Sequence, residues 1–267
     1  MRDSDLREFR LFAERLADAA RAETLPRFRA GAEIVNKAGL SFDPVTDADR
    51  EGERILRDMI GKVYPRHGLI GEEFGSERAG AEFRWVLDPV DGTRAFVCGA
   101  PTWTTLIALE RAEDAILGVI DQPFSDERWI GAAGSSLHRR AGVERTCRVS
   151  GVTSLADARI STTDPRAHGY FSEPEAEKFA RVARLARVAR FSMDAYAYGL
   201  LALGEIDLVI ETGLKRHDYA ALKPVVDGAG GFISAWNGGR LGGDDRGSVV
   251  AAASRALHAS AVEILAA

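Results

Sequence analysis

One short segment, Trp85 to Thr93, constrains the fold of this chain more than any other. It contains three apolar residues, then two acids three positions apart, Asp88 and Asp91, and finally Gly92 and Thr93. A short apolar run indicates a buried strand, and a glycine beside a hydroxyl residue is typical of a turn into a helix. The segment therefore predicts a strand that carries two carboxylates to the rim of a sheet and leads directly into a helix.

The rest of the first half predicts two helices and a sheet. Apolar residues at three- and four-residue spacing predict an amphipathic helix through Phe9, Phe12, Leu16 and Ala20. A second helix is expected from Thr46 to about Tyr64, after a loop over residues 36–44 in which we expect mobility. Apolar runs between turn-rich segments predict strands at 69–70 and 85–87 and an antiparallel meander at 104–109, 116–120, 128–132 and around Leu137.

The second half alternates strands with helices, a pattern typical of an α/β (α+β) fold. Strands are expected at 160–162, 207–210, 232–235 and 249–252. Helices are expected at 173–187 and 193–203, from Asp218 onward, and through Leu257 and Ile264. The change from a meander of strands to alternating strands and helices places a boundary near Cys147 without a linker. Residues 1–147 and 148–267 are therefore predicted to be two halves of one catalytic unit.

Composition excludes several classes of protein. The formal net charge of −5 lacks the basic excess that nucleic-acid phosphates demand, so we expect no nucleic-acid partner. Charges recur through the first ten residues and no apolar stretch is long enough to span a bilayer, so we expect neither a signal peptide nor a membrane partner. The two cysteines, Cys98 and Cys147, are too few for a disulfide framework, and this suits a reduced, cytoplasmic location.

The two acids of the opening segment can aim their carboxylates at one point. Asp88 and Asp91 are hard oxygen donors of the kind that bind Mg²⁺, with substrate phosphate as a further ligand. Between them, Pro89 stiffens the turn and helps to leave the Val90 carbonyl free to join the coordination. A turn with a helix cap is the alternative for a bare pair of aspartates, but the full strand–turn–helix segment favours a metal site.

The two residues after Asp91 predict an adjoining phosphate site. Gly92 lets the backbone come close to a ligand, and the amides of Gly92 and Thr93 lie at the start of the expected helix. Orphan N–H groups and the helix dipole favour an anion there.

Three more acids follow predicted strands or begin helices. Glu72 follows the 69–70 strand and is a third candidate carboxylate, although Glu pairs in loops commonly face only water. Asp49 is either a peripheral metal residue or the acid of a capping box with Thr46. Asp218 follows the 207–210 strand and is either a fourth carboxylate of the site or a helix N-cap.

The remaining residue types narrow the chemistry. No His or Cys cluster has zinc-ligand spacing, and no Gly-x-Ser-x-Gly segment offers a nucleophilic serine. Metal-assisted hydrolysis remains, in which cations activate a water and neutralise the charge on the leaving group. The sequence therefore predicts a hydrolase with small phosphomonoester substrates.

Together these segments resemble the inositol-monophosphatase family of magnesium-dependent, lithium-sensitive phosphatases. The resemblance rests on residues 45–49, 71–73, 88–93 and 217–231, in the family's order and spacing. It implies a layered α/β/α/β/α sandwich of the inositol-monophosphatase and sugar-phosphatase type, usually a homodimer.

The resemblance also implies roles for individual residues. The metal ligands of the family match Glu72, Asp88, Val90 through its carbonyl, Asp91 and Asp218. A threonine matching Thr93 helps to orient the attacking water, and Lys37 and Asp49 match residues associated with a weaker third metal. Two or three Mg²⁺ ions per subunit are thus implied, with Glu72, Thr93 and Asp49 as catalytic residues.

The substrate-side residues look closest to the histidinol-phosphatase branch, on the segments 194–199, 211–215 and 218–222. Asp194 and Glu211 would pair with the ammonium of histidinol, a charge that inositol lacks. Both acids would equally accept hydroxyl hydrogen bonds from a polyol. Inositol 1-phosphate or broad sugar-phosphate hydrolysis is therefore an alternative, and a non-catalytic binding or regulatory protein on the same fold is another.

Overall fold

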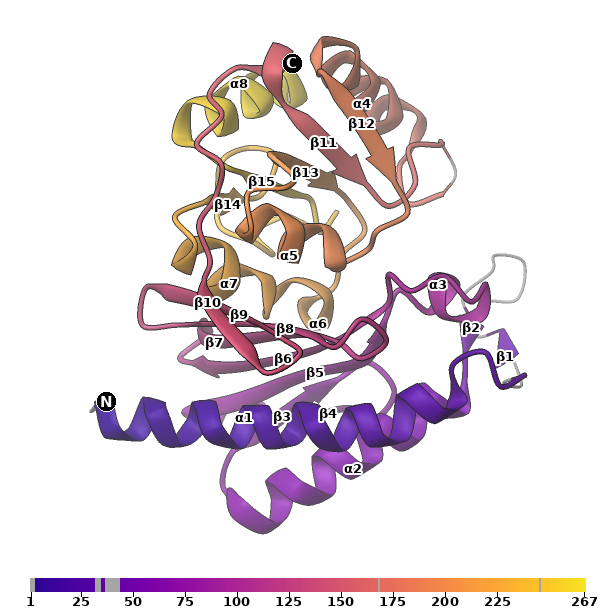
Figure 1. Cartoon of the computed structure of the whole chain (residues 1–267), viewed down its shortest axis with the longest axis vertical. Coiled ribbons are helices and arrows are strands. Elements are labelled where there is room, and N and C mark those ends of the chain that lie inside the picture. The colour runs from indigo at the N-terminus through magenta and orange to yellow at the C-terminus, as the bar shows by residue number, and fades with distance from the viewer. Residues whose placement is uncertain (1–2, 32–34, 37–43, 168, 245) are drawn as a thin grey trace.

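The computed structural model describes residues 3–31, 35–36, 44–167, 169–244 and 246–267. Their elements form five layers, helices alternating with two sheets (Figure 1). The long helices α1 (Asp3–Thr24) and α2 (Asp47–Val63) cover the outer face of an eight-stranded sheet. The helices α5 (Tyr196–Ala202), α6 (Arg216–Tyr219) and α7 (Leu222–Gly228) lie between the sheets, and α4 (Glu173–Leu185) and α8 (Arg255–Ala266) cover the second. The predicted α/β/α/β/α sandwich is confirmed.

The two N-terminal helices form as their apolar spacing predicts. Phe12, Leu16 and Ala20 are buried against the sheet, and α2 ends within one residue of the expected position. Between the helices lie the short 3-10 turn at Leu25–Arg27 and a two-strand pair of β1 (Val35–Asn36) and β2 (Pro44–Val45). The predicted mobility of the 36–44 loop falls mainly on residues 37–43, which lie outside the described residues, as does Lys37.

The first sheet contains the predicted meander. Its order is β10-β9-β8-β7-β6-β5-β3-β4, in which β5 pairs parallel to β3 and antiparallel to β6. The strands are β3 (Gly68–Gly71), β4 (Gly75–Glu77), β5 (Phe83–Asp91), β6 (Thr104–Arg111), β7 (Asp114–Gln122), β8 (Glu127–Ala132), β9 (Ser135–Arg140) and β10 (Val143–Thr146). The edge strands β4 and β10 were not predicted, because every residue in them is exposed and no apolar alternation marks them.

The second sheet has the order β12-β11-β13-β15-β14. Its strands are β11 (Arg159–Thr162), β12 (Val188–Phe191), β13 (Leu208–Glu211), β14 (Phe232–Ser234) and β15 (Val249–Ala252). Four were predicted, but β12 was not, since it is an edge strand with little burial. A 3-10 turn at Leu155–Asp157 precedes β11. Among the described helices, none is both long and apolar enough to cross a membrane.

Two predicted helices need correction. The helix expected at 193–203 begins only at Tyr196, because Ser192 and Asp194 have positive φ angles of 63° and 48° that no helix accommodates. The helix expected to open at Asp218 is instead two short helices, α6 and α7, and Asp218 lies inside the first of them.

Helix α7 lies directly against strands β7 and β8, and small residues make this possible. A Cβ atom at Gly118 would overlap the carbonyl of Ala221, and one at Gly131 would overlap the backbone of Pro224. Glycine thus allows the backbones to approach in a way that no larger residue permits. This contact joins the middle helical layer, and with it Asp218, to the first sheet.

We expect Gly131→Ala to lower the free energy of unfolding by about 1–3 kcal/mol, because the added methyl group would push α7 away from β8. The matched control is Gly61→Ala in α2, where an added Cβ meets no atom within 4 Å. That variant should leave stability unchanged or raise it by about 0.5–1 kcal/mol. Urea unfolding measures both, and equal stabilities for the two variants would contradict the close-packing argument.

Candidate metal and phosphate site

The end of β5 places the two acids of the opening segment. The register of β5 against β6 shifts between Asp88 and Asp91, a β-bulge at the end of the strand. A bulge re-aims side chains at the edge of a sheet. The carbonyl of Pro89, inside the bulge, accepts a hydrogen bond from the Thr105 hydroxyl at 2.7 Å, which holds the distorted segment in place.

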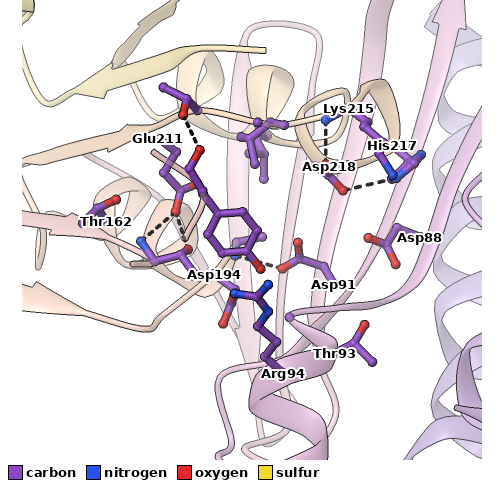
Figure 2. A pocket seen from close by; sticks show the side chains of 18 of the residues that line it. Asp88, Asp91, Thr93, Arg94, Thr162, Asp194, Glu211, Lys215, His217 and Asp218 are labelled. Atoms are coloured by element: carbon purple, nitrogen blue, oxygen red, sulfur yellow. Dashed lines mark hydrogen bonds and ion pairs between the residues drawn. The ribbon is translucent and has the colours of Figure 1, made fainter. Parts of the chain in front are cut away.

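Three carboxylates converge at this bulge. Asp88, Asp91 and Asp218 each offer one oxygen, and these atoms lie within 4.8 Å of one another. Figure 2 shows Asp218 reaching the same space from the opposite side of the pocket. Asp88 and Asp91 come from β5 and Asp218 from α6, so both halves of the chain contribute. An all-oxygen donor set of this kind suits Mg²⁺ rather than zinc.

The electrostatics of the three acids also suit a cation. Burial raises the pKa of Asp88 well above its usual range, and the charges of Glu72 and Asp91 add to the effect. The pKa of Asp91 is likewise raised well above its usual range, by burial and then by Asp194 and Asp218. Burial raises the pKa of Asp218 despite the nearby His217. Like charges held together away from water favour protons or a metal cation in their midst.

Glu72 and Val90 lie close to this cluster. Glu72 lines the same pocket, although it is not one of the three side chains that converge within 4.8 Å. Val90 also lines the pocket, and its carbonyl accepts a hydrogen bond from the Thr93 hydroxyl at 3.1 Å. The structure therefore places Glu72, Asp88, Val90 and Asp91 around the end of β5.

Asp49 and Asp218 each have a local structural contact as well. Asp49 accepts from the backbone N–H of Thr46 at 2.8 Å and from its hydroxyl at 2.6 Å, so the predicted capping box is present. Its other oxygen lies 3.3 Å from the Thr93 hydroxyl. Asp218 is not an N-cap, but it accepts from the backbone N–H of Lys215 at 2.6 Å.

The turn after Asp91 has the predicted geometry. Gly92 adopts a left-handed conformation with φ 79°, and the helix α3 (Thr93–Val97) begins immediately after it. A Cβ atom at Gly92 would lie 2.9 Å from the carboxyl carbon of Asp194, so glycine is needed for space as well as for conformation. The first amides of a helix have no intrahelical acceptor, and both Gly92 and Thr93 line the pocket.

The pocket continues from the three carboxylates to the predicted substrate-side acids. It has a volume of about 320 Å³ and includes both Asp194 and Glu211 in its lining. Glu211 accepts hydrogen bonds from the Thr163 backbone N–H at 3.1 Å and from the Tyr198 hydroxyl at 3.0 Å. Burial raises the pKa of Asp194 to about 6 and that of Glu211 to about 7.

Arg94 and Tyr170 are among the pocket residues that the sequence analysis did not single out. The guanidinium carbon of Arg94 lies 4.7 Å from the ring centroid of Tyr170, a cation–π contact that joins α3 to the loop before α4. The hydroxyl of Thr212 donates a hydrogen bond to the Tyr170 carbonyl at 3.1 Å. The position of Arg94 directly after Thr93 was a usable signal, whereas nothing local marks Tyr170.

Comparisons with known proteins agree with this geometry. A family model described as the inositol monophosphatase family matches residues 5–267. The chain is 39% identical over 274 residues to the chloroplastic bifunctional phosphatase IMPL2 of Arabidopsis thaliana, covering 98% of this chain and 76% of that protein. It is 36% identical to a histidinol-phosphatase of Mycobacterium tuberculosis, covering 88% and 90%. The solved structure of an inositol monophosphatase from Zymomonas mobilis superposes with a TM-score of 0.86 at 36% identity, covering 98% of both chains.

The raised pKa values of the pocket acids predict a pH-dependent response to Mg²⁺. A carboxyl group whose pKa is higher in the folded protein than in the unfolded chain stabilises the fold at low pH, and this contribution is lost as pH rises. For Asp194 and Glu211 the window runs from their ordinary values of 3.8 and 4.5 to about 6 and 7. The pKa values of Asp88, Asp91 and Asp218 are raised in the same direction. Because metal ions bind these three carboxylates in their deprotonated form, Mg²⁺ should raise Tm more at pH 8 than at pH 5.

Thermal unfolding in EDTA and in Mg²⁺ at both pH values measures the effect. NaCl at matched ionic strength is the control for general charge screening. An equal rise in Tm at the two pH values would contradict a carboxylate metal site.

Proposed function

The chain belongs to the inositol monophosphatase family of phosphatases, and on that basis we propose that it is a Mg²⁺-dependent histidinol-phosphate phosphatase. The single observation that carries the substrate assignment is a pair of acids, the buried Glu211 and the half-buried Asp194, on the wall of the pocket beyond the three converging carboxylates. Two of the similar proteins are a histidinol-phosphatase and a bifunctional phosphatase, and this is consistent with the assignment.

We propose that the metal ions are held by five ligands: Glu72, Asp88, the Val90 carbonyl, Asp91 and Asp218. The convergence of three of these carboxylates supports a metal site, and we propose two or three Mg²⁺ ions per subunit. Bound Mg²⁺ supplies the activation of a water and the neutralisation of phosphate charge.

The protein's own groups orient the attacking water. The Thr93 hydroxyl has two acceptors, the Val90 carbonyl at 3.1 Å and the Asp49 carboxylate at 3.3 Å. Donating its single proton to one of them leaves a lone pair that accepts a hydrogen from the water. In this proposal Glu72 takes up the proton of that water, and Asp49 keeps the hydroxyl in place.

The start of α3 would bind the phosphate of the substrate. The backbone amides of Gly92 and Thr93 are the first of the helix, and anions are favoured where such amides are unpaired. The substrate phosphate would thus lie between these amides and the three carboxylates, with its organic part toward Asp194 and Glu211.

The environment of the two substrate-side acids favours a cation. Burial raises the pKa of Asp194 to about 6 and that of Glu211 to about 7, so their negative charge is poorly solvated. The ammonium group of histidinol would compensate that charge, whereas the hydroxyl groups of inositol would not. Inositol 1-phosphate is the second candidate, because the similar Zymomonas mobilis structure is of an inositol monophosphatase and carboxylates also accept hydroxyl hydrogen bonds.

We further propose that the two halves, residues 1–147 and 148–267, work as one catalytic unit in a cytoplasmic homodimer. The contribution of Asp88 and Asp91 from one half and Asp218 from the other supports a single unit.

Asp91→Asn should lower kcat/KM for phosphomonoesters by more than about 100-fold, since the neutral amide loses a charged metal ligand. The remaining oxygen of the side chain would still accept the Ala195 N–H, which Asp91 accepts at 2.9 Å, so folding should persist. Asp227→Asn, at an exposed ion pair with Lys223, is the matched control and should retain activity. Phosphate release with Mg²⁺ measures both, and full activity of Asp91→Asn would refute the proposal.

The substrate assignment predicts that the wild-type protein prefers histidinol phosphate and that a change at Glu211 weakens this preference. Wild-type protein should have a higher kcat/KM for histidinol phosphate than for inositol 1-phosphate. Glu211→Gln removes the charge but keeps acceptors for Thr163, so it should lower kcat/KM for histidinol phosphate by about 10- to 100-fold, as for a lost hydrogen bond to a charged group. Inositol 1-phosphate should be affected much less, and a reversed wild-type preference would instead establish the second candidate.

A further inference from the structure

We propose that Glu53, which lies outside the pocket, is a positioning residue for the metal site, acting through the turn that carries Glu72. This inference rests on the proposed function, because it assigns a task to Glu53 only if Glu72 binds metal. Nothing in the sequence marks Glu53, since it lies inside the amphipathic helix α2 among many other charged residues.

The carboxylate of Glu53 is buried at 0% exposure and binds the backbone of the turn after β3. One oxygen accepts from the backbone N–H of Glu73 at 2.7 Å, and the other accepts from the N–H of Phe74 at 3.2 Å. These two amides immediately follow Glu72. The position of the Glu72 backbone, and hence of its carboxylate, is therefore set by a charged group on a rigid helix.

Gly71 makes this contact possible from the other side. A Cβ atom at position 71 would overlap the carboxylate of Glu53. The backbone just before Glu72 and the two amides just after it are thus all packed on the same buried group. A surface glutamate that only paired with an arginine would not require this cradle.

The same helix also supports the other parts of the site. Asp49, four residues before Glu53 and so on the same face of α2, lies 3.3 Å from the Thr93 hydroxyl. Gly52, between them, is packed so closely on Pro89 that an added Cβ would lie 2.7 Å from the Pro89 Cβ. One turn of α2 therefore contacts three segments of the site, those that contain Glu72, Pro89 and Thr93. Groups that hold metal ligands in place commonly change metal affinity 10- to 100-fold when altered.

A purely structural role is the competing explanation. Arg57 donates to Glu53 at 2.7 Å and also to Glu77 at 2.8 Å, so the carboxylate contributes to joining α2 to the β3–β4 hairpin. Both roles predict lost stability on substitution. Only the positioning role predicts lost Mg²⁺ affinity in protein that is still folded.

The test is Glu53→Gln. The NH₂ of the new amide replaces one carboxylate oxygen, so a hydrogen-bond donor would stand where the wild-type protein has an acceptor. Isothermal titration of full-length, substrate-free protein with Mg²⁺ should give a Kd about 10- to 100-fold weaker than wild type. Tm in EDTA, recorded in parallel, establishes that the variant is folded at the titration temperature. Gly71→Ala, which displaces the same carboxylate without removing it, should weaken Mg²⁺ binding in the same direction and keeps the test valid if Glu53→Gln does not fold.

The matched control is Asp207→Asn, at the residue just before β13 of the second sheet. Asp207 is also buried at 0% exposure and also accepts a backbone N–H, from Arg159 at 2.8 Å, but it lies outside the pocket lining. It should lose stability without a change in Mg²⁺ affinity. In a Glu72→Gln background, Glu53→Gln should weaken Mg²⁺ binding by less than about twofold more, because the two residues act through one ligand.

Unchanged Mg²⁺ affinity in folded Glu53→Gln, or full additivity with Glu72→Gln, would overturn the positioning role. Mg²⁺ binding by a wild-type protein that hydrolyses no phosphomonoester would refute the proposed function, and the affinity ratios would still decide the role of Glu53. A wild-type protein that does not bind Mg²⁺ would overturn both.

Discussion

Mutual repulsion among crowded carboxylates, one of them buried and the others half-buried, is the constraint on which the rest of this structure depends. Asp88 and Asp91 at the end of β5 meet Asp218 from α6 inside one pocket, with Glu72 close by. Without a cation, such a cluster opposes folding at neutral pH, and the raised pKa values of all three aspartates express that cost. The surrounding layers must therefore hold together acids that repel one another.

Close backbone packing and a rigid helix provide that support. Glycines in β7 and β8 let α7 lie directly on the first sheet, which ties the short helix α6 and its Asp218 to the strand that carries Asp88 and Asp91. On the other face of the sheet, one turn of α2 contacts the Thr93, Pro89 and Glu72 segments. The site is thus held between two helical layers, and its geometry does not depend on loops alone.

The substrate side of the pocket is built differently. Ser192 and Asp194 both have positive φ angles, a conformation that costs a non-glycine residue on the order of 1–2 kcal/mol. Strain of this kind persists where surrounding contacts over-determine it, and here it holds the Asp194 carboxyl against Gly92. The Arg94–Tyr170 contact is a further link between the halves beside the same acid. The metal and substrate regions are consequently adjacent, and the Ala195 N–H that Asp91 accepts joins them directly.

Local patterns in the sequence determined much of this protein. The apolar spacing of α1 and α2, the alternation of the meander and the segment from Asp88 to Thr93 each predict their structure, because burial and turn chemistry act over a few residues. Those patterns could not predict the exposed strands β4, β10 and β12, which carry no apolar alternation. Nor could they predict the αL residues that shorten α5.

Tertiary structure alone decided which residues meet. Glu53 and Tyr170 take their places from contacts with segments distant in sequence, and a side chain in a helix or loop looks the same locally whatever it later packs against. The sequence by itself thus determined the kind of site, through acids placed at strand and helix ends. Only packing across the two sheets decided how those acids are brought together and what holds them there, because the cost of burying like charges is offset by contacts that no local pattern records.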